Sequence, residues 1–137
     1  MGLMRVFDVA GSGMAAQSLR LNVVASNLAN AESTSGSAAG VYRARHPVFT
    51  VQPFDAADGG VAAGVRMAGV VESQGPARVR YEPGNPLADS QGRVYAATVN
   101  PVEEMADMIS ASRSYQTNVA MIETARDLVL RTLAMGR

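Results

Sequence analysis

The side chains that most often carry out catalysis are scarce in this sequence of 137 residues. It contains no Cys, which excludes disulfides, thiolate metal sites and Cys nucleophiles. The single His, His46, precedes Pro47 and has no second His with which to share a metal ion. Ser112 and Ser114 have no His or Lys base near them in the sequence, so nucleophilic catalysis is not supported. We therefore expect no enzyme activity, no catalytic residue and no cofactor.

Two further patterns look like ligand sites but have simpler explanations. Gly11-Ser12-Gly13 is a short GxG motif, yet no strand precedes it and a helical pattern runs through it, so a phosphate-binding loop is not expected. Glu103, Glu104 and Asp107 have the composition of a metal cluster. Acids near the start of a helix are favoured by the helix dipole, and that explanation suffices. We expect no metal site.

The charge pattern does not favour nucleic acid as a partner. The basic residues are all Arg, and these 12 are balanced by 12 acidic residues, so the formal net charge is zero. A general nucleic-acid binder carries a basic excess. Arg residues that alternate along a strand, such as Arg78 and Arg80, are usually its solvated face.

Membrane-spanning and targeting signals are also sparse in the sequence. No stretch approaches the roughly 18 consecutive apolar residues that a membrane span requires. Asp8 interrupts the first apolar run, and Gln17, Ser18 and Arg20 break up the rest, so a cleaved secretory signal is not expected. We expect no membrane insertion and, if the chain leaves the cytoplasm, export without a cleaved signal.

An uneven composition indicates the elements that position these residues. Nine of the 13 Gly and five of the six Pro lie in residues 32–99, whereas seven of the eight Met lie outside that range. Gly and Pro mark turns, and Met is a good helix former. The sequence predicts an N-terminal amphipathic helix in residues 1–31, a β-rich middle segment in 32–99 and a C-terminal amphipathic helix in 100–137.

Apolar residues recur at alternating spacings of three and four in both end segments. This heptad pattern is typical of a helix that packs against another helix along one seam. It predicts helices over 4–30 and 101–135, the second with Asn100 as N-cap and Pro101 at its first position. The expected fold is α+β, with the two helices paired as an antiparallel coiled-coil-like hairpin beside a small β-rich segment. The stripes include Phe7, Met14, Leu21, Leu28, Met105, Tyr115, Val119, Ile122, Val129 and Leu133.

The middle segment is predicted to form short strands. Alternation of apolar and other residues marks 61–71 and 79–81, and 42–51 and 93–99 are further candidate strands. Asp58-Gly59-Gly60 predicts a turn. Residues 32–40 have the composition of a mobile connection.

A single apolar stripe on each helix leaves other apolar residues uncovered, among them Ile109, Met121, Leu128 and Leu130. Exposed apolar faces of this kind usually mark a surface that binds a partner. We therefore expect the two ends to complete their burial by packing against copies of the chain or its relatives.

Asn27, Asn30 and Asn118 lie in or at the ends of the predicted helices, although Asn is a mediocre helix former. One interpretation is that the first helix ends at residues 27–30. The other is that the amides make hydrogen bonds that fix the helix register, as buried Asn does in coiled coils. The residues alone leave both interpretations open.

Three motifs resemble those of the bacterial flagellar axial proteins, the family of rod, hook and hook-associated proteins. Ser26-Asn27-Leu28-Ala29-Asn30-Ala31 resembles the N-terminal signature of that family, and residues 108–119, which include Arg113, Tyr115 and Asn118, resemble its C-terminal signature. The segment 81–92, followed by 99–105, is similar to the proximal-rod members. Together these motifs extend over nearly the whole chain.

The resemblance implies a structural subunit of the flagellar basal body that has no enzyme activity. Such proteins are exported through the flagellar type III apparatus without a cleaved signal, and they polymerise into a hollow drive shaft that crosses the periplasm and transmits torque. The implied partners are other proximal and distal rod proteins, the export-gate or MS-ring adaptor and the P-ring bushing. The stripe residues would pack within or between subunits, and Asn27, Asn30, Arg113 and Asn118 would make polar register contacts.

Two alternatives stay open at this point. A sibling rod protein has a similar length and would differ in the segment 81–92. A helical-hairpin adaptor or chaperone of an export system would be a stable soluble dimer whose middle segment need not contain strands.

Overall fold

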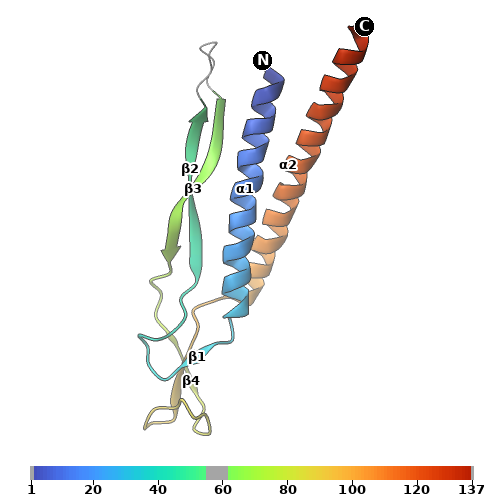
Figure 1. Cartoon of the computed structure of the whole chain (residues 1–137). Helices are drawn as coiled ribbons and strands as arrows, with labels where there is room; N and C mark the ends of the chain where they lie inside the picture. Colours follow the sequence, from blue (N-terminus) through green and yellow to red (C-terminus); the bar gives the residue numbers. More distant parts are fainter. Residues whose placement is uncertain (1, 55–61, 137) are drawn as a thin grey trace.

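Two long helices dominate the computed structural model, which describes residues 2–54 and 62–136 (Figure 1). α1 spans Gly2–Ala29 and α2 spans Pro101–Met135. They lie side by side and run in opposite directions, so that the start of α1 and the end of α2 are at the same end of the molecule (Figure 1). Both predicted helices and the α+β class are confirmed.

The start of α2 follows the prediction from the sequence. Asn100 is the N-cap, and its side-chain Oδ1 accepts a hydrogen bond from the backbone N of Val102 at 3.2 Å. Pro101 occupies the first turn, where the N–H that proline lacks would have no partner within the helix. The backbone N of Glu104 donates to the backbone O of Asn100 at 3.1 Å, which closes the first turn.

The middle segment forms two separate antiparallel sheets. β2 (Arg45–Phe54) and β3 (Ala62–Glu72) pair as a long hairpin, with a register shift between Val48 and Phe49. The second sheet has three strands in the order β1 (Thr34–Ser35), β5 (Arg93–Ala96) and β4 (Arg78–Tyr81).

These strands confirm the predicted ones with shifted ends and correct one expectation. Residues 32–40 contain the paired strand β1 and are not only a connection, because β5 offers Thr34 and Ser35 a hydrogen-bonding edge. The turn predicted at Asp58-Gly59-Gly60 lies outside the described residues.

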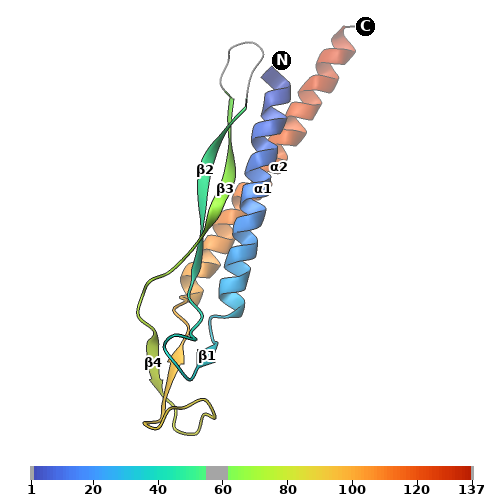
Figure 2. The ribbon, with the colours of Figure 1, turned by 60° about the vertical axis from the view of Figure 1, so that its left-hand side comes forward.

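The β2–β3 hairpin lies along α1, on the side away from α2 (Figures 1 and 2). α1 packs against both the hairpin and α2, whereas the described parts of the hairpin and α2 do not pack against each other. The expectation of one apolar seam per helix is therefore wrong for α1, which is the middle layer of three.

The buried core is small and lies mainly where the helices meet the middle segment. Ala44, Ala97 and Val99 form a buried cluster against which Ala31 and Tyr42 pack. Most buried apolar residues of the two helices are alanines, namely Ala10, Ala16, Ala111 and Ala125. Alanine lets helices approach closely but removes little apolar area from water, so it contributes less stabilisation than a larger side chain.

The Gly11-Ser12-Gly13 motif lies inside α1 and packs on two sides of that helix. Oγ of Ser12 donates to the backbone O of Val9 at 2.7 Å and accepts from the backbone N of Val65 on β3 at 3.1 Å. Gly13 faces α2, where an added Cβ would lie 2.8 Å from Nδ2 of Asn118. The motif therefore lets α1 contact both of its neighbours closely.

The loop that follows β4 is held by hydrogen bonds. The carboxylate of Asp89 accepts from the backbone N atoms of Gln91 and Arg93 at 2.8 and 2.9 Å, and from Nε of Arg93 at 3.0 Å. The hydrogen bond from the backbone of Arg93 is the main cause of a lowered pKa of Asp89. Gly92 has a φ of 72°, a left-handed conformation that favours glycine.

Alanine substitutions at the two glycines of the motif test the close approach of α1 and α2. Gly11→Ala should raise the free energy of unfolding by about 0.5–1 kcal/mol, because alanine is the better helix former and nothing lies within 4 Å of the added Cβ. Gly13→Ala should give a smaller gain or none, because the side-chain amide of Asn118 must move away from the added Cβ. Urea unfolding followed by circular dichroism measures both variants. Equal effects of the two substitutions would contradict the contact.

Candidate functional site

A buried asparagine side chain joins three elements near the end of α1. Asn27 is 0% exposed, and its carboxamide makes four hydrogen bonds. Nδ2 donates to the backbone O of Arg45 at 2.8 Å and to Oε1 of Glu104 at 2.9 Å. Oδ1 accepts from the backbone N of Arg45 at 2.9 Å and from Oη of Tyr42 at 3.0 Å. These bonds use both donors and both lone pairs of the amide. We call Asn27, Tyr42, Arg45 and Glu104 the asparagine junction.

The asparagine junction sets the relative positions of α1, β2 and α2. The paired bonds to the backbone N and O of Arg45 hold the first residue of β2 as a neighbouring strand would. Glu104 lies in the first turn of α2, so its bond to Asn27 fixes the register between the helices. Glu104 is only 4% exposed, and a buried carboxylate without a donor is costly. The buried carboxylate of Glu104 therefore depends on the hydrogen bond that Asn27 donates to it.

The exposed side chain of Arg45 contacts Tyr42 of the asparagine junction and Glu72 of β3. Its guanidinium carbon lies 5.5 Å from the centroid of the Tyr42 ring, within the range of a cation–π interaction. Its Nε lies 3.3 Å from Oε1 of Glu72 on β3. Oγ of Ser26 lies 3.2 Å from Oη of Tyr42. These contacts tie the base of the hairpin to α1.

Polar contacts continue along the seam between the helices. Nη2 of Arg20 donates to Oδ1 of Asp107 at 2.7 Å. Nearer the start of α1, Gly13 lies against the side chain of Asn118. The buried Oε1 of Gln17 has no hydrogen-bond partner among the described residues, and such a group costs stability. The seam is therefore polar and incompletely satisfied.

The three acids at the start of α2 differ in their surroundings. Glu104 belongs to the asparagine junction, Asp107 pairs with Arg20, and Glu103 is exposed. The helix dipole alone therefore does not explain why acids occur at positions 104 and 107, where each has a specific partner. The part of the chain that the structure describes holds no group of His, Asp and Glu suited to a metal ion.

The two interpretations of the asparagines apply to different residues. Nδ2 of Asn30 donates to the backbone O of Ser26 at 2.8 Å, and the backbone O of Asn30 accepts from Oγ of Ser33 at 2.7 Å. These hydrogen bonds are local and lie where α1 ends, which fits the interpretation of Asn30 as a residue at the helix end. Asn27 instead joins distant segments, as a register residue does.

Most of the predicted packing residues are half-buried in the isolated chain. They are Phe7, Met14, Leu21, Leu28, Tyr115, Val119, Ile122 and Val129. Met105 and Leu133 are 47% and 65% exposed. Arg113 is exposed and has no ion pair among the described residues. What these side chains contact in an assembly stays a prediction.

The four residues expected to lack cover are exposed, as predicted. Ile109, Met121, Leu128 and Leu130 are between 44% and 57% exposed. They leave aliphatic surface along most of α2.

Within one chain, the buried residues of α2 are Glu104, Ala111 and Ala125, which are separated by multiples of seven. Of the predicted stripe residues, Met105 directly follows Glu104 and is exposed, whereas Tyr115, Ile122 and Val129 are half-buried. The packing of this stripe between subunits stays a prediction.

The other residues considered for chemistry do not converge on a site. His46 is exposed on β2, and Ser112 and Ser114 are half-buried on α2. No helix of the described residues combines the length and the apolar character needed to span a membrane.

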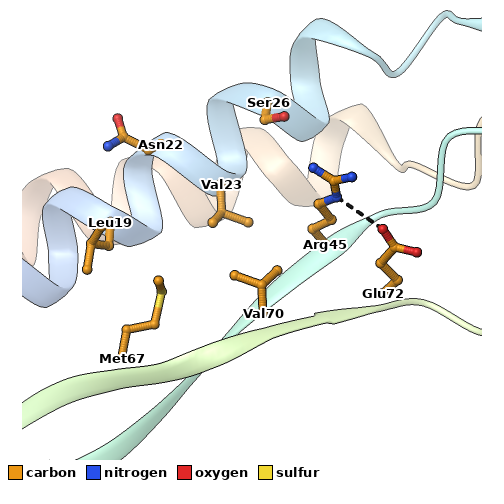
Figure 3. Close-up of a pocket in the computed structure, with 8 residues that line it drawn as sticks. All are labelled: Leu19, Asn22, Val23, Ser26, Arg45, Met67, Val70 and Glu72. Atoms are coloured by element: carbon orange, nitrogen blue, oxygen red, sulfur yellow. Dashed lines mark hydrogen bonds and ion pairs between the residues drawn. The ribbon is translucent and has the colours of Figure 1, made fainter.

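A groove of about 410 Å³ lies between α1 and the hairpin, next to the asparagine junction (Figure 3). Leu19 and Val23 of α1 face Met67 and Val70 of β3 across it (Figure 3). Its polar lining residues are Asn22, Ser26, Arg45 and Glu72. The Arg45–Glu72 ion pair lies at one end of the groove.

Both end segments of the chain match known protein families. Residues 7–36 match the family described as flagella basal body rod protein, and residues 90–135 match the C-terminal region of the flagellar basal body rod FlgEFG proteins. Flagellar basal-body rod protein FlgC of Salmonella typhimurium is 51% identical over 137 residues, which is 100% of both chains. FlgC of Escherichia coli O157:H7 is 50% identical over 100% of both chains, and FlgC of Borreliella burgdorferi is 35% identical over 98% of each.

The chain belongs to the FlgC family of flagellar basal-body rod proteins. This confirms the resemblance to the flagellar axial proteins, and it makes the chain a structural rod subunit and not a member of an enzyme family. Asn27 and Glu104 lie in the two separately matched segments, so the asparagine junction joins the parts of the chain that define the family.

Replacing Asn27 by Asp tests the asparagine junction. The variant loses the donor to Glu104 and brings two carboxylates together, and this repulsion raises the pKa of the introduced Asp in the folded state. We expect a loss of about 3 kcal/mol at neutral pH, the size seen when a buried polar network is broken. A raised folded pKa favours the folded state at low pH and loses that effect as pH rises, so the deficit should shrink on acidification. Urea unfolding at several pH values measures this.

Two further variants serve as controls for this experiment. Adding Glu104→Gln to Asn27→Asp restores a donor opposite a carboxylate and should recover part of the loss. Asn30→Asp makes the same chemical change at the local site and should cost less than about 1 kcal/mol. If Asn27→Asp and Asn30→Asp were equally destabilising, the junction would have no special role.

Proposed function

We propose that the chain is a subunit of the proximal rod, where it polymerises with its relatives into the hollow shaft that crosses the periplasm and transmits torque. The observation that carries this proposal is the full-length similarity to FlgC proteins, together with aliphatic side chains along α2 that the rest of the chain leaves exposed. Exposed apolar surface of this kind is typical of a subunit that is completed by its neighbours.

In this proposal α1 and α2, within segments 1–31 and 100–137, form the axial part that lines the inner tube. The middle segment 32–99 faces outward or contacts neighbouring subunits. The position of the β2–β3 hairpin against α1 supports a role in such contacts, because it adds a strand surface beside the helix pair.

The proposed partners are other proximal and distal rod proteins, the export-gate or MS-ring adaptor and the P-ring bushing. Export would run through the flagellar type III apparatus without a cleaved signal. The small and polar residues at the helix seam support this route, because a weakly stabilised fold costs little to keep unfolded before export.

Mass spectrometry of hook–basal bodies purified from the source bacterium tests the proposal. We expect the chain in the rod fraction at a fixed ratio to other rod proteins. Its absence from intact particles, together with a soluble pool in the cytoplasm, would contradict the rod role and favour an export adaptor or chaperone.

A substitution in the half-buried part of α2 tests the packing role. Val119→Asp would place a charge without a partner in a packed surface, which is costly, so we expect rod assembly and motility to be lost. Thr117→Asp adds the same charge at an exposed position two residues away and should leave swimming intact. Motile cells that carry Val119→Asp would refute the placement of this residue.

A further inference from the structure

Among the described residues, the β2–β3 hairpin is a sheet of two strands, so each strand has one paired edge and one outer edge. An outer edge presents unpaired N–H and C=O groups, and such edges readily pair with strands of other molecules. In an antiparallel pair, a residue directs both groups either to its partner strand or to the outer edge, and the two kinds of residue alternate. One residue of known direction therefore determines the directions of its neighbours.

Contacts with α1 show which hairpin residues direct their backbone outward. The backbone N and O of Arg45 both bind the carboxamide of Asn27, at 2.9 and 2.8 Å, so Arg45 is directed outward on β2. The backbone N of Val65 donates to Oγ of Ser12 at 3.1 Å, so Val65 is directed outward on β3. Val51 is the cross-strand partner of Val65 and is therefore directed outward on β2. The strands cross in Figure 1, with β2 nearer to α1 at the base of the hairpin and β3 nearer to it toward the other end.

Both prolines of the hairpin lie at outward positions of β2. Pro47 is two residues after Arg45, before the register shift of the hairpin, and Pro53 is two residues after Val51, beyond that shift. Proline has no backbone N–H. Neither proline therefore removes a hydrogen bond between β2 and β3, and each removes a donor from the outer edge.

The segment between the prolines has the composition of a strand that pairs with copies of itself. Residues 48–52 carry no charge, and most of them are β-branched or aromatic, namely Val48, Phe49, Thr50 and Val51. Short uncharged segments of this kind stack readily as identical strands. The side chains of Val48 and Val51 are 44% and 67% exposed, so the segment is accessible to another molecule.

Few donors are left for such pairing on the outer edge of β2. Its outward positions are 45, 47, 49, 51 and 53. The N–H of Arg45 is already bound by Asn27, and the two prolines have none. Phe49 and Val51 keep an outward N–H, and a proline ring flanks them on each side. An added strand needs a donor at every second residue along the edge, so this edge offers only a short interrupted template.

We propose that Pro47 and Pro53 prevent the outer edge of β2 from pairing with the same edge of another copy of the chain. Natural sheets use proline on edge strands in this way, and residues that flank an apolar strand limit its aggregation. The two prolines let copies of the chain come close together without joining as a β-sheet. This inference goes beyond the proposed rod function and does not depend on it.

Replacing both prolines by threonine tests the proposal on the purified full-length chain. Pro47→Thr with Pro53→Thr restores two outward N–H groups and introduces residues that favour strands. We expect an unchanged circular dichroism spectrum and aggregation at least about tenfold faster, followed by sedimentation and thioflavin T fluorescence. The matched control is Pro76→Thr with Pro86→Thr, which removes two exposed prolines outside the strands and should aggregate no faster than the unaltered chain.

A third substitution separates edge pairing from a loss of stability. Val51→Lys, added to Pro47→Thr with Pro53→Thr, places a charge on the edge that repels an identical strand and should return aggregation to the slow rate. Lysine favours strands less than valine does, so this rescue cannot come from a more stable hairpin. The proposal is overturned if the double proline variant aggregates as slowly as the unaltered chain, if the control pair accelerates aggregation equally, or if Val51→Lys does not slow it.

Discussion

The carboxamide of Asn27 is the constraint on which the rest of the structure depends. A buried amide must satisfy two donors and two acceptors, and here its four partners come from three places: Tyr42 just before β2, the backbone of Arg45 at its start, and Glu104 in the first turn of α2. Only one relative position of these segments meets all four bonds. The end of α1, the base of the hairpin and the start of α2 are therefore fixed together, although 77 residues separate Asn27 from Glu104.

Specificity and stability come from different features in this chain. The seam between α1 and α2 is specified by polar pairs and by alanines and Gly13, which bury little apolar area. Such a seam defines a register well but contributes little hydrophobic stabilisation. The larger aliphatic side chains of α2 are instead on its outer faces, where Ile109 and Leu128 remain in contact with water. A chain that leaves this aliphatic surface in water suits a structural rod subunit, whose neighbours can cover it.

The sequence was informative about elements and less so about which faces meet. Heptad spacing predicted both long helices, and Asn100 and Pro101 marked the start of the second, because capping and periodicity are local properties. A pattern of large apolar side chains does not single out Ala111, Ala125 or Glu104, which are the buried residues of α2 within one chain. The partner of Glu104 was missed because the helix dipole explained an acid there equally well.

Docking of the hairpin on α1 depends on contacts distant in sequence, such as that of Ser12 with Val65, and no local pattern signals them.

The Gly11-Ser12-Gly13 segment shows why such contacts matter to the fold. As a helical segment it is unfavourable, since each glycine costs about 1 kcal/mol relative to alanine. Ser12 and Gly13 are explained because α1 is a middle layer, with β3 on one side and α2 on the other, whereas nothing lies within 4 Å of a Cβ added at Gly11. Ser12 supplies a hydroxyl that accepts a hydrogen bond from the hairpin, and Gly13 lets Asn118 approach on the opposite side. A helix that must contact a sheet and a second helix within one turn needs small residues there, so its lower intrinsic propensity is a consequence of its position between the two.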